Sequence, residues 1–132
     1  MDALRKKGLS YLIDHGPVRK TDAVMFDIDD TLIFTNGVIN TPILKLLWDA
    51  QAMGFLIVII TARPGSQPVI QFTVQQLERN GIVFDKLAFA DAHMKGKVKR
   101  DLGYNFVLSV GDQPTDFTDS RHFINTSNFS HN

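Results

Sequence analysis

Short apolar runs that alternate with helix-like segments are the feature of this 132-residue chain that most constrains its fold. Four such runs are typical of buried strands, at residues 23–28, 55–60, 83–90 and 106–110. Segments with helical spacing of apolar residues lie at 4–13, 41–54, 65–80 and 95–102. Strands that alternate with helices pair in parallel, with helices on both faces of the sheet. We therefore predict an α/β fold, a three-layer Rossmann-like parallel sheet.

The remaining segments carry weaker patterns. Residues 34–40 contain Asn36-Gly37, which predicts a turn or small hairpin. Residues 114–119 are predicted to form a short helix and residues 122–125 an edge strand, while the polar tail at 126–132 is expected to fray. One helix fills every gap between strands, which leaves no room for an inserted domain. We expect a single domain over residues 1–132, with its core at 21–126.

Composition excludes several classes of function. The formal net charge is zero, so charge gives no indication of nucleic-acid binding or of a membrane partner. The chain has no cysteine, which removes disulfides, thiol catalysis and zinc–thiolate sites. Its longest apolar run, Phe55–Ile60, is too short to span a bilayer, and the N-terminus lacks the apolar stretch of a signal peptide. We expect a cytoplasmic protein.

Polar side chains gather where three of the predicted strands end. The first strand leads into Asp27-Ile28-Asp29-Asp30-Thr31, the second into Thr61-Ala62-Arg63, and the fourth into Gly111-Asp112-Gln113-Pro114-Thr115-Asp116. In an open α/β sheet, ligands bind beyond the carboxyl ends of the strands. Carboxylates at the end of a buried strand need a partner of opposite charge. We expect that partner to be a bound cation used in phosphate chemistry.

In this order the residues resemble the four motifs of the haloacid dehalogenase-like superfamily: an aspartate pair, a hydroxyl, a lysine and a terminal acidic pair. The resemblance covers residues 23–125. The acid-phosphatase-type (class IIIB-like) branch is the most similar, on the following residues: Lys95-Gly96, Leu102-Gly103-Tyr104, Val110-Gly111-Asp112-Gln113, Asp116 and Phe117. The resemblance implies a haloacid dehalogenase-like phosphatase without a cap domain, a Mg²⁺-dependent phosphomonoester hydrolase.

The resemblance also implies a role for each acidic residue and for the hydroxyl. Asp27 is the nucleophile that forms an aspartyl-phosphate, and Asp29 is first the general acid and then the general base. Thr61 donates its hydroxyl to the phosphoryl oxygens. Asp27 and Asp112 hold Mg²⁺ together with the main-chain carbonyl of Asp29. Asp116 completes the acidic pair as a further residue of the metal site, where it orients either the lysine or a metal-bound water.

The lysine of the third motif is assigned to Lys95, which would neutralise the phosphoryl group as a point charge. Lys95 precedes Gly96 at the start of a predicted helix, where the superfamily places this lysine. Lys97 and Lys99 lie in the same helix and compete for the role. The ordinary expectation for each of them is an exposed helix lysine, and Lys97 remains the main alternative.

Arg63 is predicted to bind substrate, because an arginine directly after Thr61-Ala62 could grip a second anionic group with two hydrogen bonds. The alternative is an exposed loop arginine. Ala62 and Asp30 are the other predicted substrate-binding positions. Asp30 stands where many members of the superfamily carry glycine.

Two other functions remain open beside phosphatase activity. One is a non-enzymatic aspartate phospho-acceptor like a receiver domain, against which Asp29 argues. The other is a binding protein that keeps a phosphatase fold without its activity. The complete set of motif residues argues against it. The expected partner is a phosphorylated substrate: a small phosphomonoester, a nucleotide, or an exposed phosphate on a macromolecule such as a nucleic-acid end. A neighbouring subunit of a homo-oligomer could close the open site.

Overall fold

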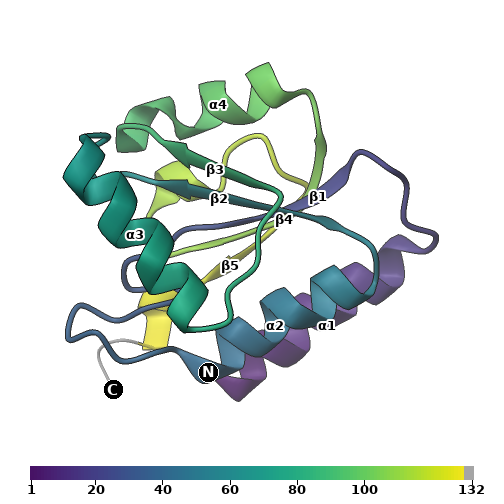
Figure 1. The fold of residues 1–132 in the computed structure, drawn as a ribbon. Helices are drawn as coiled ribbons and strands as arrows, with labels where there is room; N and C mark the ends of the chain where they lie inside the picture. Colours follow the sequence, from purple (N-terminus) through teal and green to yellow (C-terminus); the bar gives the residue numbers. More distant parts are fainter. Residues whose placement is uncertain (130–132) are drawn as a thin grey trace.

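The chain forms one parallel five-stranded sheet with the strand order β3-β2-β1-β4-β5 (Figure 1). The structure is a computed structural model that describes residues 1–129. Its strands are β1 (Asp22–Phe26), β2 (Leu56–Thr61), β3 (Lys86–Phe89), β4 (Asn105–Gly111) and β5 (His122–Asn125). All four neighbouring pairs of strands are parallel. The predicted α/β class with a parallel sheet is confirmed.

Within residues 1–129, four helices and three short 3₁₀ helices lie before, between and after the strands. The helices are α1 (Asp2–His15), α2 (Thr41–Ala52), α3 (Gln67–Arg79) and α4 (Lys95–Leu102). The 3₁₀ helices are η1 (Ala92–Met94), η2 (Pro114–Asp116) and η3 (Thr126–Phe129). Helix α2 begins at Thr41-Pro42 as predicted, because a proline in the first turn lacks only an N–H that a helix start leaves unused. None of the helices within residues 1–129 is long and apolar enough to cross a membrane.

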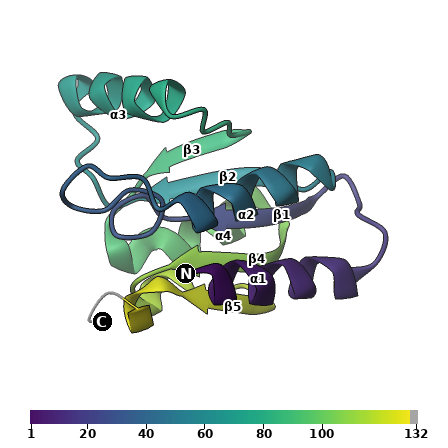
Figure 2. The same cartoon turned by 90° about the horizontal axis from the view of Figure 1, so that it is seen from below.

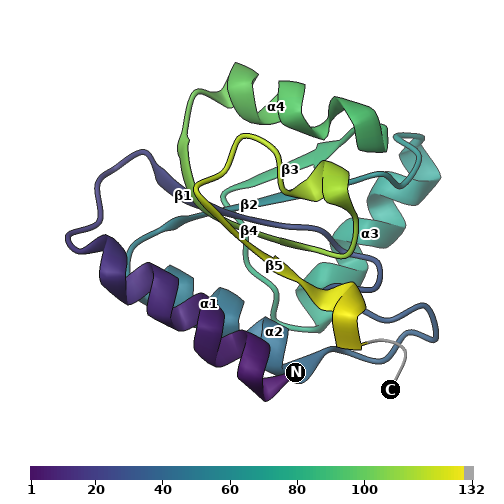
Figure 3. The same cartoon turned by 180° about the vertical axis from the view of Figure 1, so that it is seen from behind.

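The sheet separates two apolar clusters, as the alternation of side chains along β1 requires. Val24 and Phe26 face the larger cluster beneath α1 and α2, and Ala23 and Met25 face the smaller one beneath α4. Figure 3 shows α1 and α2 side by side on one face of the sheet and α4 on the other. In Figure 2, α3 lies beyond β3 at one end of the sheet. This three-layer arrangement is the predicted one.

The sequence predicted a frayed tail from residue 126 onward, but residues 126–129 form the 3₁₀ helix η3. Thr126 is fully buried, and its Oγ1 lies 2.8 Å from the carbonyl oxygen of Asp30 and 3.3 Å from that of Gly111. Its hydroxyl therefore ties the segment after β5 to the loops after β1 and β4. Residues 130–132, which belong to the same prediction, lie outside the described residues.

Two of the other segments differ from the sequence prediction: the short helix expected at 114–119 is only the 3₁₀ helix η2 (Pro114–Asp116), and one strand begins later than expected. Ile33 and Ile39 pair across the turn at 34–38, which is the small hairpin expected there. Strand β3 begins only at Lys86, because Asp85 turns its carboxylate toward the Ile57 amide at 2.7 Å. Within residues 1–129, the connections between strands carry the helices and this hairpin and no further folded unit.

Candidate active site

The carboxyl ends of β1, β2 and β4 meet at one edge of the sheet, because the strands are parallel and adjacent. Asp27 directly follows β1, Thr61 ends β2, and Asp112 directly follows β4. A cavity of about 370 Å³ opens here. Its walls include the predicted site residues Asp27, Asp29, Asp30, Ala62, Arg63, Lys95, Asp112 and Asp116. Thus the tertiary structure brings residues from three motifs into one cavity, with Thr61 beside it.

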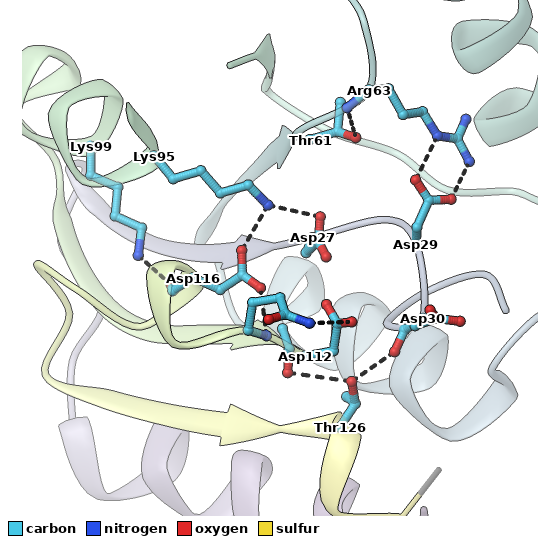
Figure 4. Close-up of polar contacts among 12 residues, drawn as sticks. Asp27, Asp29, Asp30, Thr61, Arg63, Lys95, Lys99, Asp112, Asp116 and Thr126 are labelled. Atoms are coloured by element: carbon cyan, nitrogen blue, oxygen red, sulfur yellow. Dashed lines mark hydrogen bonds and ion pairs between the residues drawn. The ribbon is translucent and has the colours of Figure 1, made fainter. Parts of the chain in front are cut away.

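Lys95 joins two buried carboxylates at the centre of the site (Figure 4). Its Nζ donates to Asp27 Oδ1 at 2.9 Å and to Asp116 Oδ1 at 2.7 Å. The Lys95 side chain is only 3% exposed. Lys97, the alternative, lies on the surface and pairs with Asp101 one helical turn away. The structure therefore places Lys95, and not Lys97, among the carboxylates.

Burial and charge oppose each other at this ion pair. Burial would lower the pKa of Lys95, but Asp27 and Asp116 outweigh it and raise that pKa, so the ammonium stays charged. Burial raises the pKa of Asp27 to about 7; Lys95 counteracts this, and the neighbouring charge of Asp116 adds to it. The site thus holds more negative charge than the single lysine neutralises.

A divalent cation fits this surplus of carboxylates. One oxygen each from Asp27, Asp112 and Asp116 lies within 4.8 Å of the others. All three donors are carboxylate oxygens, which suit a hard ion such as Mg²⁺. The Asp112 carboxylate accepts a long hydrogen bond of 3.5 Å from the Gln113 side-chain amide, and it also lies close enough to Asp27 to help raise the pKa of that carboxyl. The Asp29 carboxylate is not part of this group, and a contribution through its main-chain carbonyl stays a prediction.

The η2 turn places Asp116 beside Lys95. Asp116 Oδ2 accepts a hydrogen bond from the Gln113 amide at 3.1 Å, which closes a capping box over the turn. Gly111 makes this turn possible, since a Cβ at position 111 would collide with the Asp116 side chain. Gly111 therefore has a steric role in the site, because it leaves the space that Asp116 occupies.

Lys99 is a residue whose role the sequence reasoning missed, because it was expected on the helix surface. It is 1% exposed, and its Nζ donates to the carbonyl oxygens of Asp116 and Thr118 at 2.6 and 2.7 Å. It also lies 2.9 Å from Ser109 Oγ and 3.1 Å from Ser120 Oγ. Burial lowers the pKa of Lys99 to about 8. The available signal was the i, i+4 spacing, which puts Lys95 and Lys99 on one face of α4.

Arg63 does not reach into the cavity as a free cation. Its Nε and Nη2 bind the two carboxylate oxygens of Asp29 at 3.0 and 2.8 Å (Figure 4). Thr61 Oγ1 accepts a hydrogen bond from the Arg63 amide at 3.1 Å, which leaves the threonine hydrogen for a second acceptor. In this structure Arg63 is therefore an ion-paired and largely buried residue, not an exposed loop arginine, and its predicted contact with substrate stays a prediction.

Asp30 and Ala62 line the cavity, and one carboxylate oxygen of Asp30 is held by the neighbouring hairpin. Asp30 Oδ1 accepts hydrogen bonds from the amide and hydroxyl of Thr35 at 3.2 and 2.8 Å, which secures the hairpin at 33–39. Asp30 also has a φ of 59°, in the left-handed region that aspartate tolerates better than most residues. This conformation explains how Asp30 can stand where many members of the superfamily carry glycine.

Solved structures share this fold. The class C acid phosphatase from Bacillus anthracis has a TM-score of 0.66 at 20% identity, and its tungstate-bound form has 0.63 at 22%; each match covers 89% of this chain and 65% of the other. A chain of the Pnkp1/Rnl/Hen1 complex has a TM-score of 0.61 at 21% identity, over 74% of this chain and 41% of the other. This chain has the haloacid dehalogenase-like fold.

The expectation drawn from the four motifs is therefore confirmed at the level of the fold, including the likeness to acid phosphatases. No family model and no curated protein matches the sequence. The chain spans less than two thirds of the length of the solved phosphatase chains that it matches.

Proposed function

We propose that this protein is a Mg²⁺-dependent phosphomonoester hydrolase that works through an aspartyl-phosphate on Asp27. The observation that carries the proposal is the buried Asp27 carboxylate, held 2.9 Å from Lys95 and grouped with Asp112 and Asp116 at the end of β1. The ends of β1 and β4 and the start of α4 together contribute what phosphoryl transfer needs: a nucleophile, an oxygen-lined cation site and charge neutralisation. The likeness in fold to acid phosphatases supports the same class of reaction.

The chain's own residues account for the main requirements of the reaction. Lys95 engages Asp27 Oδ1, so Oδ2 is the oxygen available to attack phosphorus. Lys95 also provides positive charge next to the incoming phosphoryl group, and the Thr61 hydroxyl can donate to one of its oxygens. Mg²⁺ bound by Asp27, Asp112 and Asp116 would supply charge stabilisation in the transition state.

Asp29 is assigned the proton transfers. It lies two residues after the nucleophile and lines the same cavity, with its side chain 52% exposed. In the first step it would protonate the leaving oxygen, and in the second it would take a proton from the water that hydrolyses the aspartyl-phosphate. A phospho-acceptor protein has no need of this second step, so the presence of Asp29 supports turnover.

Hydrolysis of p-nitrophenyl phosphate in Mg²⁺ tests the proposal directly. We expect activity in the wild type, none in Asp27→Asn, and a large loss in Lys95→Met. Lys97→Met is the matched control, because Lys97 is an exposed lysine of the same helix, and it should retain activity. Intact-mass measurement after acid quenching separates the alternatives. A long-lived wild-type phosphoprotein without turnover would favour a phospho-acceptor, and neither product nor phosphoprotein would favour a binding protein.

A further inference from the structure

Arg63 is bound on two sides at once, and this arrangement points to a role for it. On one side it makes the two-bond contact with Asp29 described above. On the other side its Nη1 donates to Thr73 Oγ1 at 3.1 Å and to Gln76 Oε1 at 2.9 Å, both on α3. We infer that Arg63 is a positioning residue that fixes the Asp29 carboxylate against α3, and not a ligand of the substrate. This inference rests on the proposed function.

The hydrogen-bond inventory of the guanidinium supports this role. A guanidinium has five N–H donors, and four of them are used by Asp29, Thr73 and Gln76. The Arg63 side chain is 13% exposed, whereas the Asp29 side chain is 52% exposed. The group that the cavity presents to a substrate is therefore the carboxylate, with the arginine behind it. One N–H donor, on Nη2, is left by these contacts, so a substrate anion would gain a two-bond contact with this arginine only by displacing Asp29 or breaking the contacts with α3.

The contacts that hold Arg63 against α3 involve a buried partner and a neighbouring ring. Thr73 is fully buried, and the Phe72 ring lies 6.0 Å from the guanidinium carbon. The backbone of Arg63 is held as well, through its amide and the hydroxyl of Thr61. The Arg63 guanidinium thus links three segments: the loop after β1, the loop after β2, and helix α3. Without Arg63, the half-exposed Asp29 side chain would be free to change rotamer.

Positioning has a measurable consequence for the reaction. General acid–base assistance is typically worth about 10²–10⁴-fold, and a displacement of about 1 Å can remove about 10²-fold. We therefore expect Arg63→Gln to lower kcat by about 10²-fold and to leave KM nearly unchanged. A substrate ligand would show the opposite pattern, with the main effect on KM and the largest effect on substrates that carry a second anionic group.

A double-mutant cycle tests the inference. The cycle compares wild type, Arg63→Gln, Asp29→Asn and the double variant, each assayed at high enzyme concentration with an aryl phosphate. If Arg63 acts through Asp29, Arg63→Gln lowers kcat in the wild-type background and causes no further loss in the Asp29→Asn background. A loss that persists in the Asp29→Asn background, or a rise in KM in both backgrounds, would overturn the inference.

Two further variants separate positioning from a general structural role. Thr73→Val combined with Gln76→Leu removes the anchors on α3 and should lower kcat in the same direction, again only when Asp29 is present. If Arg63 bound substrate, releasing it from α3 would lower KM instead. Arg79→Gln, at an exposed arginine near the end of the same helix, is the control and should leave kcat and KM unchanged.

Thermal unfolding of every variant checks that the fold is retained. Asp27→Asn is assayed in parallel so that the two proposals fail separately. Hydrolysis that does not depend on Asp27 would overturn the proposed function and this inference together. Hydrolysis that depends on Asp27, combined with additive losses in the double-mutant cycle, would overturn the positioning role of Arg63 alone.

Discussion

Replacing Asp27 with asparagine should abolish activity and, in the absence of a divalent cation, stabilise the fold. Burial raises the pKa of the Asp27 carboxyl to about 7, although Lys95 counteracts it, and the ordinary value is 3.8. A difference of about three units corresponds to about 4 kcal/mol of folding free energy once the group is ionised. Asparagine is nearly isosteric and carries no charge, so it removes this destabilisation together with the nucleophile.

The sign of the pH dependence follows from the raised pKa. The unfolded chain releases the Asp27 proton near pH 3.8, whereas the folded chain keeps it up to about pH 7. The wild type therefore loses stability from this group as the pH rises between these values, and Asp27→Asn does not. We expect the stability advantage of the variant to grow from near zero at pH 4 to as much as about 4 kcal/mol above pH 7.

Urea denaturation in EDTA at pH 5 and pH 8 measures this difference. The variant should have the higher midpoint at pH 8, and a smaller advantage at pH 5. Added Mg²⁺ should stabilise the wild type more than the variant, because a ligand stabilises the state that binds it. If Asp27→Asn is less stable than the wild type at pH 8 in EDTA, the carboxylate is not destabilised by burial. The surplus of negative charge that supports the cation site would then be refuted.

Three further predictions concern the metal, the proton transfers and the opposite end of the sheet. EDTA should abolish activity, and added Mg²⁺ should restore it. Asp112→Asn should raise the Mg²⁺ concentration needed for the half-maximal rate. Full activity in the presence of chelator would show that the reaction needs no metal ion. Asp29→Ala should lose more activity on alkyl than on aryl phosphates, because a poor leaving group needs more help from a general acid. The losses should lie within the range of about 10²–10⁴-fold that is typical of acid–base catalysis. Equal losses on both substrates would refute the acid role. Burial alone would raise the pKa of Asp22, but hydrogen bonds from Arg19, Asn105 and His15 hold it at about 2. Asp22→Asn should therefore cost about 1–3 kcal/mol of stability above pH 4, a difference that urea denaturation should find shrinking as the pH falls toward 2.

The order of elements and the location of the site could be inferred from residues close together in the sequence. Apolar runs bounded by polar residues indicated strands, and their alternation with helical segments indicated parallel pairing. Parallel strands put their carboxyl ends at the same edge, so Asp27, Thr61 and Asp112 were expected to meet, as they do. These inferences succeeded because they depend on the period of the hydrophobic pattern and on the direction of the chain, which are local properties.

The contacts of individual side chains depended instead on residues far away in the sequence. Arg63 binds Asp29 across 34 residues, Lys99 binds the Asp116 carbonyl across 17, and Thr126 binds the Asp30 carbonyl across 96. From the sequence, Arg63 was expected to be open to substrate or exposed, Lys99 to be exposed, and Thr126 to belong to a frayed tail. A polar side chain is buried only where the assembled fold supplies its hydrogen-bond partners. Local sequence patterns therefore indicate which side chains gather at the sheet edge, whereas contacts between distant segments decide which of their charges are paired, buried and held in place there.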